Sequence, residues 1–280
     1  MQIELIGCTS AGKSTLKSSI VEACTERQLA IWGDKEFVLE QFGLNWVKID
    51  LLRTMLVDGV ALIACMVTIK RNLMFYRFTR RVLRQLPLSI FDKFYILRNV
   101  LRKLGKYEII RSYGTEEQII LVDEGVLQVA HNLFVHVTDQ TAEAALYSLA
   151  TFVRLAPQPD VIIYLRQPAA LLIDRIMQRG HKRIVERTYE NVERFVEQAV
   201  STFDKLAENP ALKPKLLVID NGQEVIPPAN DEAKSRFNQI LQILHDSIGK
   251  MKTSAAVDTV GGNRFVERAQ TSPVIQANGG

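Results

Sequence analysis

Eight consecutive residues near the N-terminus have the types and spacing that hold the phosphate groups of a nucleotide. The run Gly7-Cys8-Thr9-Ser10-Ala11-Gly12-Lys13-Ser14, followed by Thr15, fits the pattern G-x-x-x-x-G-K-[ST] in full. Glycines at both ends of such a loop allow a tight turn whose backbone N–H groups point at phosphate oxygens, and the following helix adds the positive end of its dipole. In this pattern the lysine reaches the β- and γ-phosphates and the serine hydroxyl ligates Mg²⁺. We therefore expect residues 7–15 to bind ATP, with Lys13 as a catalytic residue and Ser14 as a metal ligand.

A second anchor for the metal is expected where another buried strand ends. Residues 119–122 form a continuous apolar run that is followed by Asp123 and Glu124. Asp123 is the carboxylate expected near Mg²⁺, directly or through water, and counts as catalytic. Glu124 has two readings: it is a candidate general base for an acceptor, or it positions water in a nucleotide-hydrolysing switch. The alternative for both is a strand that merely ends in two polar residues.

Three arginines later in the chain are candidates for closing over the transferred phosphoryl group. Arg175 and Arg179 lie four residues apart and share a helix face, Gly180 frees the chain to form a loop, and Arg183 follows. Arginines in such a lid stabilise the developing charge and help to exclude water. The alternative is a solvated basic helix end, which the helix dipole favours.

The elements that must position these residues alternate between strand and helix. Strands are predicted at 2–6, 29–32, 119–122, 161–165 and 215–219. Helices are predicted at 13–27, through most of 44–104, and at about 168–179, 188–207 and 231–250, with turns at Gly59, Pro87 and Gly105. This alternation predicts an α/β fold in which a parallel five-stranded sheet lies between two helical layers, and the motif at residues 7–14 makes it a fold of the P-loop NTPase type. We expect a kinase domain over 1–250 with a helical insert at about 44–115, and a disordered tail over 251–280.

A later stretch resembles the thymidylate kinase and deoxynucleoside kinase group of P-loop kinases. The resemblance rests on Ile163-Tyr164-Leu165-Arg166-Gln167-Pro168, on the arginines and glycine at 175, 179 and 180, and on Leu216-Leu217-Val218-Ile219-Asp220. It implies that Asp220 and Asn221 border the ATP base.

The acceptor side departs from that group. Glu124 stands where these kinases commonly carry an arginine, and their Glu-Pro motif after the second strand is not found. Asp34 and Glu36 lie in the right neighbourhood for a general base and join Glu124 as candidates. The kinase scaffold is therefore implied, whereas a nucleoside acceptor does not follow.

The insert is strongly cationic between residues 70 and 111. Twelve lysines and arginines there face only Asp92 and Glu108, and Arg77, Arg80, Arg81 and Arg84 share one helix face. Such a face suits an anionic membrane surface or an acidic or phosphorylated acceptor. It also suits a solvated surface over an ordinary core. No recognised nucleic-acid-binding module is present.

Composition narrows the class of protein further. The chain has 280 residues, a formal net charge of +4 and three cysteines without metal-ligand spacing, which favours a reducing, cytoplasmic setting with possible peripheral contact to a membrane. No signal peptide is visible, and the apolar run 59–69 is too short to span a bilayer.

The leading hypothesis is an ATP-dependent kinase that uses Mg²⁺ and phosphorylates a small-molecule hydroxyl or phosphate. The alternatives are a P-loop ATPase acting as a switch, a kinase of a sugar or lipid-linked acceptor, and a non-catalytic binding protein. Assembly as a homodimer is left open.

Overall fold

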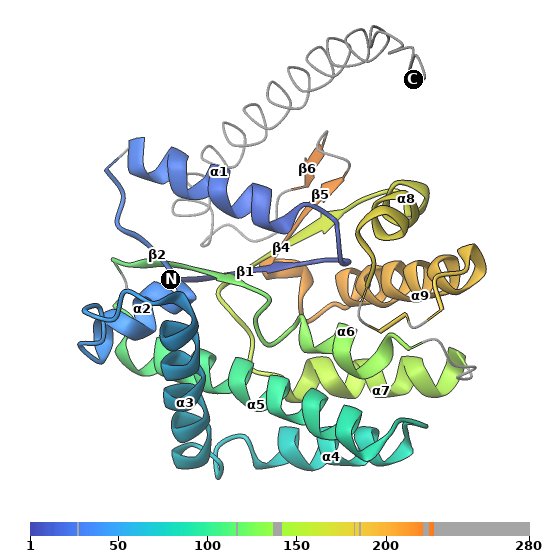
Figure 1. Cartoon of the computed structure of the whole chain (residues 1–280), viewed down its shortest axis with the longest axis horizontal. Helices are drawn as coiled ribbons and strands as arrows, with labels where there is room; N and C mark the ends of the chain where they lie inside the picture. Colours follow the sequence, from blue (N-terminus) through green and yellow to red (C-terminus); the bar gives the residue numbers. More distant parts are fainter. Residues whose placement is uncertain are drawn as a thin grey trace, which may run out of the picture.

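A computed structural model of the chain describes residues 1–220, except 27, 116, 137–141, 182 and 185, together with the short strand 224–226 (Figure 1). The predicted helix at 231–250, the predicted tail at 251–280 and Asn221 lie outside the described residues.

A six-stranded sheet forms the middle layer of the molecule, in the order β2-β3-β1-β4-β5-β6. Its strands are β1 (Gln2–Ile6), β2 (Ile31–Gly33), β3 (Ile119–Asp123), β4 (Val161–Arg166), β5 (Leu216–Asp220) and β6 (Glu224–Ile226). The first five are parallel, as predicted. The sixth pairs antiparallel with β5 and was not predicted.

Helices cover both faces of this sheet. They are α1 (Lys13–Glu26), α2 (Asp34–Gln41), α3 (Asp50–Val67), α4 (Leu73–Gln85), α5 (Ile90–Tyr113), α6 (Val129–Phe134), α7 (Ala142–Leu155), α8 (Ala169–Arg179) and α9 (Tyr189–Glu208). Figure 1 shows α1 above the sheet, and α5, α6 and α7 below it. All five residues of β1 and the first five of β4 are buried, as expected for strands covered on both faces. The predicted three-layer fold is confirmed.

Two glycines predicted to mark turns lie inside helices instead. Gly59 is within α3 and Gly105 is within α5. A Cβ atom at Gly105 would lie 1.8 Å from the carbonyl oxygen of Ala61, so the missing side chain lets α3 and α5 pack with their backbones in close approach. The turn prediction was wrong at both positions, and at Gly105 the glycine serves the packing of two helices.

Two observations concern the expected reducing setting and the expected lack of a membrane span. All three cysteines are buried and free of disulfide bonds. Among the described residues, no helix has the length and apolar character needed to cross a membrane.

Candidate functional site

The loop between β1 and α1 has the backbone of a tight, strained turn. Gly7 and Gly12 have φ angles of 141° and 99°, and Ser10 has a φ of 65°. A Cβ atom at Gly7 would lie 2.7 Å from the carbonyl oxygen of Leu165 on the neighbouring strand β4. Glycine is therefore required at this position by both its dihedral angle and its neighbour.

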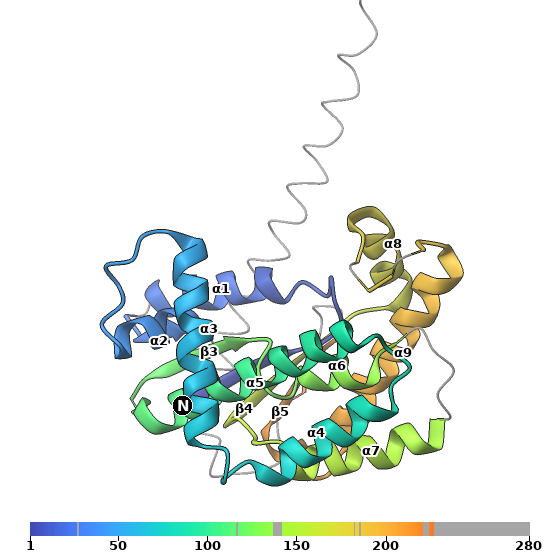
Figure 2. The same ribbon diagram turned by 60° about the horizontal axis from the view of Figure 1, so that its bottom comes forward.

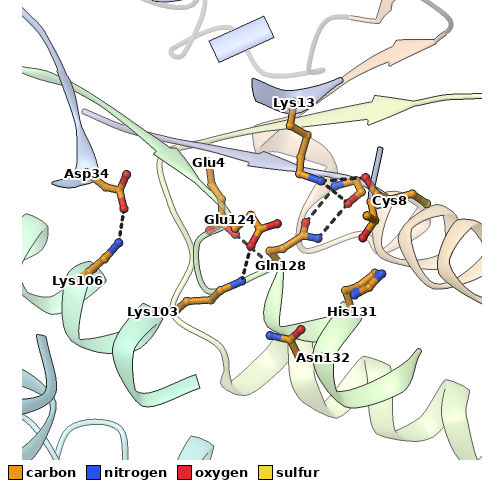
Figure 3. A network of polar contacts seen from close by, with 12 residues as sticks. Glu4, Cys8, Lys13, Asp34, Lys103, Lys106, Glu124, Gln128, His131 and Asn132 are labelled. Carbon is orange, nitrogen blue, oxygen red and sulfur yellow. Dashed lines mark hydrogen bonds and ion pairs between the residues drawn. The ribbon is translucent and has the colours of Figure 1, made fainter. Parts of the chain in front are cut away.

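Lys13 folds back over this loop. Its Nζ donates hydrogen bonds to the carbonyl oxygens of Gly7 and Cys8, both at 2.9 Å. Burial lowers the pKa of Lys13, and the nearby charges of Glu124 and Asp123 act in the opposite direction. The ammonium group therefore lies between the loop and Glu124, the residue after β3, as Figure 3 shows.

Asp123 is the last residue of β3, and one of its carboxylate oxygens is free to bind a ligand. Its register partner on β1 is Leu5, so it lies on the strand next to the one that leads into the loop. Its Oδ1 is buried and has no hydrogen-bond partner within the described residues. Burial, and then the charge of Glu124, raise the pKa of Asp123. An orphaned carboxylate oxygen fits a hard cation such as Mg²⁺, and the exposed Ser14 at the start of α1 offers a hydroxyl ligand.

A pocket of about 710 Å³ opens beside the loop. The phosphate loop contributes Thr9 to its wall, and the end of β3 contributes Glu124. Most of the remaining polar wall comes from α5, from α6 and the residue before it, and from the chain after α8: Asn99, Arg102, Lys103, Gln128, His131, Asn132, His181 and Arg183. The wall is therefore continuous with the loop and rich in charged and hydrogen-bonding groups.

Glu124 and Lys103 form the charged floor of this pocket. Lys103 Nζ lies 3.5 Å from Glu124 Oε2, and the lysine is the largest cause of a lowered pKa for Glu124. Burial lowers the pKa of Lys103, and the charges of Glu124 and Glu4 act in the opposite direction without cancelling the shift. Burial raises the pKa of Glu4 on β1 to about 7. Glu124 is thus held deprotonated with its side chain half exposed to the pocket.

The amide of Gln128 holds the first residue of the loop. Its Oε1 accepts from the N–H of Gly7 at 3.1 Å, and its Nε2 donates to the carbonyl oxygen of Gly7 at 3.0 Å. The backbone N–H of Gln128 in turn donates to Glu4 Oε1 at 3.0 Å (Figure 3). Sequence reasoning missed this residue. Its position five residues after the end of a parallel strand, at the edge where such strands gather functional loops, was the available signal.

The three candidate lid arginines differ in position. Arg175 Nη1 donates to the carbonyl oxygen of Ser10 in the loop at 3.0 Å. Arg183 donates to the carbonyl oxygen of His131 and to the side chain of Asn132, and it lines the pocket. Arg179 is exposed and does not line the pocket. The structure therefore brings two of the three to the loop and pocket.

Three histidines around the pocket are held neutral. Burial lowers the pKa of His136 and of His181 to about 4, and lowers that of His131 well below its usual range. The Nε2 atoms of His131 and His136 are buried and have no partner within the described part of the chain. At neutral pH the pocket's positive charge therefore comes from arginine and lysine, with uncharged imidazoles beside them.

The three general-base candidates are separated by the structure. Asp34 begins α2 and is buried, with Lys106 Nζ at 2.7 Å and Lys17 Nζ at 4.0 Å from its carboxylate. Glu36 is exposed on the same helix. Neither lines the pocket, whereas Glu124 does. Which of the three carboxylates acts as a general base stays a prediction.

Asp220 lies at the end of β5, at the same edge of the sheet as the phosphate loop. Its Oδ2 is 3.6 Å from Arg166 Nη1, and Arg166 also pairs with Asp204 at 3.1 Å. Asp220 is thus held in place by β4, and its proposed role beside the ATP base stays a prediction.

Comparison with known proteins adds a likeness to solved structures. No family model matches the chain, and no curated protein matches it. Structures of deoxyadenosine kinase from M. mycoides are similar: one with bound dATP has a TM-score of 0.39 and 15% identity, covering 87% of this chain and 99% of the other. Another, with products dCMP and a flexible dCDP, has a TM-score of 0.41 and 13% identity, covering 90% and 100%. These proteins belong to the group that the sequence resembles. At such low TM-scores and identities, the likeness says nothing about the activity of this chain.

Proposed function

We propose that this chain is an ATP-dependent kinase that transfers the γ-phosphoryl group of ATP to a hydroxyl or phosphate of a small molecule. One observation carries the proposal. The pocket of about 710 Å³ is lined both by Thr9 of the phosphate loop and by Glu124 at the end of β3. A ligand in it would lie against the place where the γ-phosphate is expected. The volume is in the range of small-molecule sites and suits an acceptor of about nucleoside size.

The loop and its neighbours supply the groups that phosphoryl transfer needs. Backbone N–H groups of residues 7–15 would hold the phosphates, and the Lys13 ammonium group would exchange its carbonyl partners for phosphate oxygens. Ser14 and Asp123 would hold Mg²⁺, which supplies charge neutralisation on the phosphates when bound. Arg175, anchored to the loop, and Arg183, in the pocket wall, would stabilise the charge of the transferred group.

Glu124 is the general base in this proposal. It is held deprotonated by Lys103 and faces the acceptor pocket, so it can accept the proton of an acceptor hydroxyl as the new P–O bond forms and the bond to ADP breaks. Asp34 is instead a structural carboxylate, because Lys106 and Lys17 neutralise it away from the pocket.

A second function is favoured by the same residue. Glu124 follows Asp123 directly, and a water molecule in place of an acceptor would make the chain a nucleotide-hydrolysing switch. The two functions differ in one observable, since a kinase releases little phosphate without an acceptor and a switch releases it readily.

The test uses γ-labelled ATP with Mg²⁺, alone and with pools of nucleosides, nucleoside monophosphates, sugars and lipid extracts. Label should move to an acceptor with the wild type and not with Lys13→Ala. Glu124→Gln should lower kcat by about a hundredfold or more with little change in the KM for ATP. Asp34→Asn is the matched control, a single carboxylate-to-amide change that should retain most activity.

Two outcomes would contradict the assignment. Loss of transfer in Asp34→Asn with full activity in Glu124→Gln would make Asp34 the base. Rapid phosphate release that no pool alters would show a switch in place of a kinase.

A further inference from the structure

One edge of the molecule combines unpaired positive charge with exposed apolar side chains. It consists of the end of α3, the helix α4 and the first turn of α5, which follow one another along the lower edge in Figure 1 and come forward in Figure 2. We call this surface the α4 edge. Its composition is already unusual in the sequence, because no acidic residue occurs between Asp58 and Asp92.

The helix α4 separates its residues cleanly by face. Phe75, Thr79, Val82 and Leu83 are buried against the body of the protein. The opposite face carries Arg77, Arg80, Arg81 and Arg84, all exposed. Within the described chain, none of these four arginines has an ion pair or hydrogen bond to a carboxylate. By contrast, Arg71, Arg98, Arg102 and Arg111 of the same insert are paired with Asp58 or Glu108.

Apolar side chains flank the arginines on both sides. At the start of α5, Ile90 is 83% exposed, Phe91 is 86% exposed and Phe94 is 67% exposed. Val67 at the end of α3 and Met74 at the start of α4 are also exposed. Single exposed apolar residues are ordinary on protein surfaces, whereas a run of them beside a cationic helix face indicates a site of contact.

From this arrangement we propose that the α4 edge docks on an anionic lipid surface. The four arginines would lie at the level of the phosphate headgroups, and the exposed side chains of Ile90, Phe91 and Phe94 would enter the boundary with the acyl chains. An anionic lipid surface is the partner whose charge complements that of the four arginines. A two-fold contact between copies would place the same patch against itself, so the unpaired arginines would face one another.

The α4 edge and the pocket share the first turn of α5. Asp92 and Tyr95 line the pocket, while Phe91 and Phe94 beside them in the sequence are exposed. Docking would therefore bring the rim of the pocket to the lipid surface. If the proposed kinase activity holds, this placement favours an acceptor that is presented at that surface. The docking itself does not depend on the kinase activity.

The test is sedimentation of the full chain with vesicles of phosphatidylcholine alone, and with vesicles in which about a third of the lipid is phosphatidylglycerol. The wild type should bind the anionic vesicles and not the neutral ones, and added salt should weaken the binding. Arg77→Gln/Arg81→Gln should weaken it about tenfold. Phe91→Ser/Phe94→Ser should weaken it as well and reduce its resistance to salt.

Lys205→Gln/Lys213→Gln is the matched control, because it removes two charges from α9 and from the turn before β5 and should bind as the wild type does. All three double variants change side chains away from the buried core, and circular dichroism would check their folding. Equal binding to neutral and anionic vesicles would overturn the proposal, as would unchanged binding by Arg77→Gln/Arg81→Gln. So would preferential binding to RNA or DNA in competition with the vesicles. ATP turnover measured without lipid should be the same in every variant, which separates this proposal from that of the kinase.

Discussion

Replacing a glycine by alanine should change the stability of the protein in opposite directions at two positions, Gly105 in α5 and Gly59 in α3. In Gly105→Ala the new Cβ would lie 1.8 Å from the oxygen, 2.5 Å from the carbon and 2.9 Å from the Cα of Ala61, all backbone atoms. The helices α3 and α5 would have to separate by more than 1 Å to restore ordinary contact. In Gly59→Ala the new Cβ would meet no atom within 4 Å, on an exposed position of α3.

The magnitudes follow from two opposing effects. Alanine is better than glycine in a helix by about 1 kcal/mol, which acts in both variants. Overpacking between helices costs about 3 kcal/mol where backbone atoms must move. Gly105→Ala should therefore lower the free energy of unfolding by about 2 kcal/mol and lower Tm by about 4 °C or more, whereas Gly59→Ala should raise the free energy of unfolding by up to about 1 kcal/mol.

Urea unfolding followed by far-ultraviolet circular dichroism, together with thermal unfolding, measures both values on the same preparation. The wild type and Gly59→Ala are the two controls with which Gly105→Ala is compared. If both alanine variants shift stability in the same direction, the close approach of α3 and α5 at Gly105 is not what the glycine provides, and the reasoning fails.

Three further results are expected. Gln128→Leu should raise the KM for ATP at least tenfold in a phosphotransfer assay, because it removes two buried hydrogen bonds to Gly7; an unchanged KM would show that the loop holds its shape alone. The raised pKa of Glu4, from 4.5 to about 7, means that the folded chain binds this proton more tightly than the unfolded chain. The stabilisation from this proton, on the order of 3 kcal/mol, is present below pH 4.5 and is lost as the pH rises through 7. In urea unfolding, the free energy of unfolding of the wild type should therefore fall relative to that of Glu4→Gln across this pH range. Parallel curves for the two proteins would contradict this expectation. Glu108→Leu should cost about 2 kcal/mol in the same unfolding assay, because it leaves the buried amide of Asn72 without the acceptor that it has at 2.9 Å. The two arginines that pair with Glu108 are partly exposed and can return to water, so they add little to this cost. A loss below 1 kcal/mol would show that the cluster adds little.

The strands and the phosphate loop were predictable because their signals are local. The apolar runs of β1, β3, β4 and β5 are short, continuous and bounded by turn residues, and all four strands formed within one residue of the predicted ends. The loop pattern is equally local, since the glycines that it requires adopt positive φ angles in the structure.

The wall of the pocket was not predictable, because its residues meet only through the tertiary fold. Lys103 comes from α5 and pairs with Glu124, which follows β3, and Gln128 reaches back to Gly7. Asp34 pairs with Lys106, 72 residues later, and nothing in the sequence indicates this ion pair. The turn predicted at Gly105 was wrong for the same reason, because the residue against which Gly105 packs, Ala61, lies on another helix.

The central position of β1 has a consequence for synthesis of the chain. Both of its neighbours in the sheet come much later in the sequence, β3 at Ile119–Asp123 and β4 at Val161–Arg166. On a ribosome adding about 5–20 residues per second, β1 waits roughly ten seconds or longer before both partners exist. During that time an apolar strand with two open edges is exposed, which is the kind of segment that chaperones bind. The phosphate loop, which follows β1 directly, gains both of its flanking strands only after β3 and β4 have been made.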